Sequence, residues 1–140
     1  MTTTEIDPTD LAAAVRRFPA GQPVWMVNLL RFRPQARYSE AVGPIDAASG
    51  QQVYLTRYLP AFNRVMTPHG VSTLVFAAMV TARVVGPSDA NWDAVAVATY
   101  PSIEVFRDLV EDPAYLAEAA PHRMAALADW QLFATTSLDN

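Results

Sequence analysis

The chain has 140 residues, of which 51% are hydrophobic and 17% are charged, and its formal net charge at pH 7 is -4. This length fits a single domain, and this composition excludes an intrinsically disordered chain. The chain contains neither cysteine nor lysine, which excludes disulfide bonds, a cysteine nucleophile, a Schiff-base lysine and a P-loop.

The distribution of charge and of apolar residues argues against two kinds of partner. The basic residues are all arginines and form no long basic run, so we expect no nucleic-acid partner. The apolar stretches fall short of the ~20 residues of a membrane-spanning helix, so we expect no membrane partner either. The first ten residues are polar and acidic, unlike a signal or transit peptide, and we expect a cytoplasmic protein.

The first part of the chain predicts a short helix followed by a strand. Pro8 is well placed in a first helical turn with Asp7 as its cap, and residues 1–23 are interpreted as a tail and a short helix. Val24–Phe32 reads VWMVNLLRF, a β-rich run that is apolar on both faces. Asn28 in its middle needs hydrogen-bond partners, because an unpaired buried amide costs about 1–3 kcal/mol. Residues 24–140 are expected to form the main domain.

A long connection and a helix follow. Residues 33–50 have no periodicity, and a loop of this length is typical of a lid, a binding loop or a disordered segment. Gln51–Met66 predicts a helix with an apolar stripe that includes Tyr54 and Tyr58. Because proline removes a backbone hydrogen bond, Pro60 predicts a kink or break near Leu59.

The second half predicts two strands, a helical region and a last strand. Val71–Val85 and Trp92–Tyr100 form a predicted hairpin, and Asp129–Ser137 is the last strand. Residues 103–127 form helices that restart at prolines. The resulting order, β-α-β-β-α-β after a short N-terminal helix, predicts an α+β ferredoxin-like sandwich. Since the strands are apolar on both faces, we expect a second copy to cover the free face in a homodimer.

Three segments carry a resemblance to a known family. They are VNLLRF in the first strand, SGQQVYLTRY at the first long helix, and WDAVAVATYPSIEVFRDLVEDPAYLAEAAPHRMAALADWQL near the C-terminus. With these segments the chain resembles the family called domain of unknown function 1330, of the dimeric α+β barrel superfamily. The resemblance implies two four-stranded sheets that close into a barrel across a dimer, with small-molecule pockets between helices and sheet. The superfamily includes cofactor-free monooxygenases, haem-degrading enzymes, cyclases and isomerases.

Three residues are candidate catalytic groups. His122 has the ordinary pKa of about 6.5 that suits general acid-base work, although a histidine that caps or packs a helix would look the same. Arg123 beside it can bind an oxyanion, or it can form a structural ion pair with Asp129 or Asp112. Asn28 can hold a carbonyl oxygen or oxyanion, or it can be a satisfied core amide.

Six further residues are candidates for the wall of a substrate pocket, although aromatic residues at helical spacing more often belong to a core. They are Tyr54, Tyr58, Arg31, Tyr38, Trp92 and Tyr115. The two histidines of the chain do not form an HxH or HExxH pair, so we predict no metal site and no cofactor.

The leading hypothesis for function is a metal-free, nucleotide-free enzyme acting on a small aromatic or carbonyl-bearing molecule, as a monooxygenase or a cyclase/isomerase. In this hypothesis His122 moves a proton, while Arg123 and Asn28 hold negative charge. The alternatives are a non-catalytic ligand-binding or stress-related barrel, and a haem-binding or haem-degrading barrel with His122 as the iron ligand.

Overall fold

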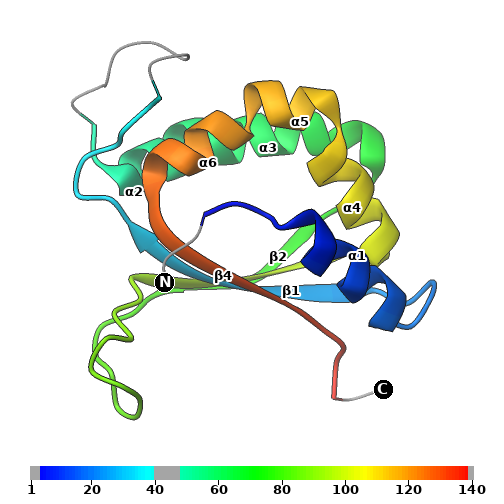
Figure 1. Ribbon diagram of the computed structural model, residues 1–140, viewed down its shortest axis with the longest axis horizontal. Helices are drawn as coiled ribbons and strands as arrows, with labels where there is room; N and C mark the ends of the chain where they lie inside the picture. The colour runs from blue at the N-terminus through cyan, green and yellow to red at the C-terminus, as the bar shows by residue number, and fades with distance from the viewer. Residues whose placement is uncertain (1–3, 40–47, 139–140) are drawn as a thin grey trace.

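The computed structural model describes residues 4–39 and 48–138. They form a mixed α+β fold in which the helices lie on one face of a four-stranded antiparallel sheet (Figure 1). In chain order the elements are α1 (Pro8–Arg17), β1 (Val24–Phe32), α2 (Gly50–Val53), the π-helical turn η2 (Tyr54–Tyr58), α3 (Leu59–Met66), the 3-10 turn η3 (Thr67–His69), β2 (Thr73–Met79), β3 (Ala94–Tyr100), α4 (Ile103–Glu111), α5 (Pro113–Glu118), α6 (Ala120–Ala126) and β4 (Leu127–Thr135).

The strand order β2-β3-β1-β4 is that of a ferredoxin-like sheet and confirms the fold class predicted from the sequence. Strand β1 lies in the middle of the sheet and keeps the bounds that its sequence predicts. Asn28 of β1 is opposite Ala96 of β3 on one side and Leu132 of β4 on the other. Its side chain therefore projects from the centre of the sheet.

The helix starts follow the capping residues in the sequence. The Asp7 carboxylate accepts the Thr9 backbone N–H at 2.7 Å and begins α1. The Ser102 hydroxyl accepts the Val105 N–H at 3.2 Å and begins α4. Each of these side chains satisfies a backbone donor that the first helical turn leaves without a partner.

Of the kink or break predicted near Leu59, the break does not occur, because the chain stays helical through Pro60. Pro60 has no N–H to donate to the carbonyl four residues back, and the preceding turn widens instead. In η2 the Leu59 N–H donates to the Tyr54 carbonyl, five residues back. The result is a single π-helical turn that contains both Tyr54 and Tyr58.

The strand predicted over Val71–Val85 is too long, since β2 ends at Met79. The Val80 N–H still donates to the Asp93 carbonyl at 2.8 Å, after which the chain leaves the sheet. Val84 and Val85 are both 92% exposed in the connection to β3. Their β-branched side chains favour a strand, but none of the strands β1 to β4 pairs with them.

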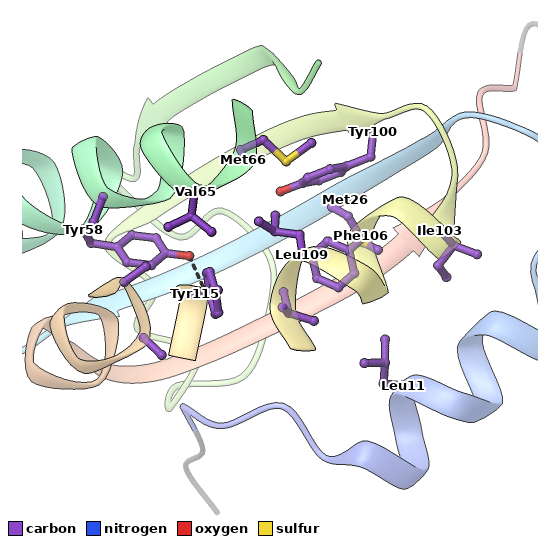
Figure 2. Packing of buried hydrophobic residues seen from close by; sticks show 14 of the residues in the cluster. Leu11, Met26, Tyr58, Val65, Met66, Tyr100, Ile103, Phe106, Leu109 and Tyr115 are labelled. Atoms are coloured by element: carbon purple, nitrogen blue, oxygen red, sulfur yellow. Dashed lines mark hydrogen bonds between the residues drawn. The ribbon is translucent and has the colours of Figure 1, made fainter. Parts of the chain in front are cut away.

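The main core lies between the sheet and the helices. Helix α4 buries an apolar stripe, in which Ile103 and Leu109 are fully enclosed. Figure 2 shows this layer meeting Met26 from β1 and Tyr100 from β3, with Tyr115 close to Tyr58. Full burial of one such aliphatic side chain stabilises the fold by about 1.5–3 kcal/mol.

The opposite face of the sheet carries no helix (Figure 1). Alternation along the strands turns Trp25, Val27, Val97, Phe76 and Phe133 towards it. Phe76 is 55% exposed and Phe133 is 51% exposed in the single chain. This apolar outer face is the surface that the expected second copy would cover, and the dimer stays a prediction. No helix in residues 4–39 and 48–138 is long and apolar enough to cross a membrane.

Candidate functional site

A cavity of about 520 Å³ lies between the inner face of the sheet and the helical segment η2–α3. Its floor includes Ala94, Ala96 and Ala98, the alternate residues of β3 that face the helices. Ala77 of β2 adds another small side chain to this floor. Larger residues here would fill the space between sheet and helix, so this alternation of alanines leaves a pocket of ordinary ligand-binding size.

Asn28 lines this cavity and is held by hydrogen bonds. Its Oδ1 accepts the indole N–H of Trp130 at 3.0 Å. Because an indole can only donate, this contact fixes the orientation of the amide and turns Nδ2 away from Trp130. Nδ2 donates to the carbonyls of Met26 at 3.4 Å and Ala96 at 3.3 Å. These two bonds are long, which leaves the amide able to donate to a ligand oxygen.

Tyr54 and Tyr58 of η2 form the aromatic wall of the cavity. Their ring centroids are 5.0 Å apart, and Phe32 packs edge-on against Tyr54 with a centroid distance of 5.6 Å. Burial raises the pKa of both tyrosines well above the ordinary value, so both phenols are neutral donors at pH 7. Within the described part of the chain, the Tyr54 hydroxyl has no hydrogen-bond partner.

Arg123 lies behind the cavity, in the core, and is only 5% exposed. Its Nη1 donates to the Tyr115 hydroxyl at 2.6 Å, and its Nη2 donates to the Thr4 carbonyl at 3.2 Å. The guanidinium also lies over the Trp130 ring at 4.8 Å. The Tyr115 hydroxyl in turn is 2.9 Å from that of Tyr58, the contact drawn as a dashed line in Figure 2.

His122 has a different environment from Arg123. Its Nδ1 is 2.6 Å from the Tyr38 hydroxyl, whose oxygen also accepts Arg57 Nη1 at 3.2 Å. Partial burial, and then the positive charges of Arg57 and Arg64, lower the pKa of His122 below its usual value. A neutral imidazole accepting from Tyr38 agrees with that shift.

The candidate residues therefore fall into separate groups. Asn28, Tyr54 and Tyr58 line the cavity, while His122 and Tyr38 do not. Tyr115 and Arg123 form a layer behind it. Trp92 lies in the connection between β2 and β3, and the side chain of Arg31, from β1, contacts this connection. Arg31 Nε donates to the Asn91 carbonyl at 3.0 Å, and the guanidinium lies 5.6 Å from the Trp92 ring centroid.

Sequence reasoning missed two features of the site. Trp130 was not among the candidates, although it fixes the Asn28 amide. The alternating alanines of β3 were recognised as strand residues only, although small residues on a buried face are the signal of a cavity. The loop predicted over residues 33–50 as a lid, binding loop or disordered segment includes residues 40–47, which lie outside the described residues.

A smaller hollow of about 340 Å³ lies between α1, α4 and β4. Leu11, Phe106 and Leu132 line its apolar part. Asp7 is also at this hollow, but its carboxylate caps α1. Over residues 4–39 and 48–138, no group of three or more acidic or histidine side chains could hold a metal ion.

Comparisons with known proteins agree with this architecture. The chain is similar over 97% of its length to the crystal structure of RPA0582, a protein of unknown function from Rhodopseudomonas palustris, at 32% identity, with 98% of that chain covered and a TM-score of 0.78. The structure of methylated RPA0582 matches at 32% identity and a TM-score of 0.74, over 99% of this chain and 97% of that one. A search of curated proteins found no match.

Residues 44–130 match the family described as EthD domain. This family is of the dimeric α+β barrel type, which agrees with the superfamily that the sequence resembles. The finer resemblance, to domain of unknown function 1330, is not confirmed. The chain belongs to the EthD domain family.

Proposed function

We propose that this protein is an enzyme that binds a small aromatic or carbonyl-bearing molecule in the cavity between η2–α3 and the sheet. The observation that carries the proposal is the pairing of an apolar space of about 520 Å³ with the Asn28 amide at its floor. Apolar walls with a few placed polar groups are the usual composition of small-molecule sites.

The chemistry that suits this cavity is stabilisation of negative charge on a substrate oxygen. The Asn28 amide N–H and the Tyr54 hydroxyl are neutral donors at the cavity, and neither is bound tightly by the protein. Preorganised donors of this kind stabilise an enolate or phenolate oxygen as it forms. An isomerisation, a cyclisation and a cofactor-free oxygenation each pass through such an oxyanion, so the proposal covers these three reaction types.

The proposal assigns no chemical step to His122. Its ring contacts Tyr38, and it is not a residue of the cavity lining. The described lining residues include no imidazole and no carboxylate, so they offer neither a histidine ligand for haem iron nor an ordinary metal ligand set. The haem alternative is therefore the less favoured one. A non-catalytic binding protein would use the same cavity, and only a measurement of turnover distinguishes it from an enzyme.

A cavity-filling variant tests whether this space is the binding site. Ala96→Leu places a larger side chain in the cavity floor, and we expect it to weaken binding of small phenols and aromatic ketones at least ~10-fold by calorimetry. The matched control is Val97→Leu, the next residue of β3, whose side chain points to the outer face. It should bind like the wild type.

Turnover is then followed for the tightest ligands by oxygen consumption and by NMR of the products. Asn28→Leu should reduce kcat by ~10²-fold or more, because it removes an oxyanion donor. Binding that is equal in the wild type and in Ala96→Leu contradicts the proposed site. Binding without turnover of any ligand supports the non-catalytic alternative.

A further inference from the structure

Arg123 is a buried charge with no acidic partner among residues 4–39 and 48–138. Its contacts are the Tyr115 hydroxyl, the Thr4 carbonyl and the Trp130 ring. Its Nε is buried and has no hydrogen-bond partner. In residues 4–39 and 48–138, no carboxylate lies within ion-pair distance of the guanidinium, and the Asp112 carboxylate is bonded to His69 instead. A buried charge without a counter-charge is strongly unfavourable.

The neighbouring tyrosines do not supply the missing negative charge. Tyr54 and Tyr58 are the phenols nearest to Arg123 at the cavity, and burial raises the pKa of both despite the opposing effect of that charge. Both are therefore neutral at pH 7, so neither of them balances the positive charge of Arg123.

Two short routes connect this charge to the cavity. On one side Arg123 donates to Tyr115, whose hydroxyl is in contact with that of the cavity residue Tyr58. On the other side Arg123 lies on the face of Trp130, whose N–H is bonded to the cavity residue Asn28. Each route places one residue between the guanidinium and the cavity wall. Among the described lining residues there is no carboxylate that would offset this positive charge.

We propose that the substrate of this cavity is an organic anion: a small apolar, preferably aromatic, molecule with an anionic oxygen, as in a carboxylate or phenolate. This inference rests on the proposed function and names its substrate class. The Asn28 amide and the Tyr54 hydroxyl donate to the anionic oxygen, and Arg123 stabilises it from behind the wall. A carboxylate substrate is ionised at pH 7 before it binds, so its binding transfers no proton to the lining.

The test compares two probes of nearly equal shape, 2-naphthoate and 2-naphthamide, by calorimetry at pH 7. We expect the wild-type protein to bind the carboxylate at least ~10-fold more tightly than the amide. In Arg123→Gln, which retains a hydrogen-bonding side chain, the two affinities should become equal through loss of carboxylate binding. Ala96→Leu should weaken both probes equally, which places them in the cavity and excludes binding at a surface arginine.

The outcomes separate this inference from the proposed function. If the amide binds as tightly as the carboxylate and Ala96→Leu weakens both, the cavity is a binding site but the anion inference is wrong. If neither probe binds the wild type, both proposals fail. The wild-type comparison does not depend on whether Arg123→Gln folds, and a carboxylate preference that persists in a folded Arg123→Gln protein also overturns the inference.

Discussion

The Trp130 indole N–H donates to Asn28 Oδ1 at 3.0 Å and joins the inner faces of β4 and β1 across 102 positions of sequence. This bond determines which end of the amide faces the cavity. It also connects the cavity floor to Arg123, whose guanidinium lies over the face of the same indole ring, 4.8 Å from the ring centroid. Trp130 therefore orients the Asn28 amide and also packs against the buried guanidinium of Arg123.

Replacing Trp130 by Phe should destabilise the protein and weaken ligand binding. The variant leaves the half-buried Asn28 Oδ1 without its donor, and loss of such a hydrogen bond costs about 1 kcal/mol. Urea unfolding measures the loss of stability, and calorimetry with 2-naphthoate measures the loss of affinity. The control is Trp92→Phe, whose indole ring contacts Arg31 at the β2–β3 connection, and its ligand affinity should be unchanged. Equal affinity in Trp130→Phe and the wild type would contradict the positioning role.

Sequence alone predicts that Asn28 must have partners, because the amide stands in a buried strand. It does not identify Trp130 as the partner, since a pairing between β1 and β4 depends on the register of the folded sheet. The bounds of β1 and the cap at Asp7 are local features, and these are predicted correctly.

The pair His122-Arg123 shows where sequence reasoning reaches its limit. The two residues are adjacent in the chain, which suggested a common site. On a helix, however, successive side chains point about 100° apart. Arg123 turns into the core towards Tyr115, whereas His122 turns to Tyr38. Which of the two side chains turns into the core depends on the packing of α6, and the sequence does not contain that information locally.

Tyr115→Phe should be clearly more destabilising than Tyr58→Phe. The Tyr115 hydroxyl accepts from Arg123 and contacts Tyr58, so its removal leaves a buried guanidinium short of an acceptor at a cost of about 2–4 kcal/mol. Tyr58→Phe removes one neutral contact and should cost about 1 kcal/mol. Both proteins are compared by urea unfolding, and equal losses would show that the contact between Arg123 and Tyr115 contributes little.

Gly50→Ala should destabilise the start of α2. A β-carbon at this position would collide with the Ala126 carbonyl oxygen and would lie 2.5 Å from the Arg33 carbonyl oxygen. Since both contacts are backbone atoms, relief requires movement of β1 or α6, and we expect a loss of about 3 kcal/mol. Gly21→Ala is the comparison: it has open space but φ of 72°, and should cost about 1 kcal/mol. A smaller loss for Gly50→Ala than for Gly21→Ala would contradict this account.

A charge on the outer face of the sheet should dissociate the expected dimer. Phe76→Arg places a guanidinium in an apolar surface that also contains Val97 and Phe133. If two copies meet through this face, light scattering at micromolar concentration should change from dimer to monomer. Leu116→Arg is the control, because Leu116 is 55% exposed on α5, in the helical layer. A monomeric wild-type protein would overturn the dimer and the closed barrel with it.

The protonation of His122 should follow the charge at Arg57. Partial burial and then Arg57 lower the pKa of His122, so in NMR titrations its ring signal should change below pH 6.5. Arg57→Gln should move this pKa back towards 6.5, and Arg64→Gln should move it less, since Arg64 is the weaker cause and is exposed near Glu118. Only two histidines are present, and His69→Gln assigns the signals.

The lowered pKa of His122 also determines whether stability rises or falls with pH. The folded state holds the His122 proton less tightly than the unfolded state does. The contribution of His122 to the free energy of unfolding should therefore be complete above pH 6.5. It should decrease as the pH falls from 6.5 to the lower pKa of the folded state. In His122→Gln this part of the decrease should disappear. A wild-type His122 signal that titrates at or above pH 6.5, or an equal pH dependence of both proteins, would show that burial and the charge at Arg57 do not control this histidine.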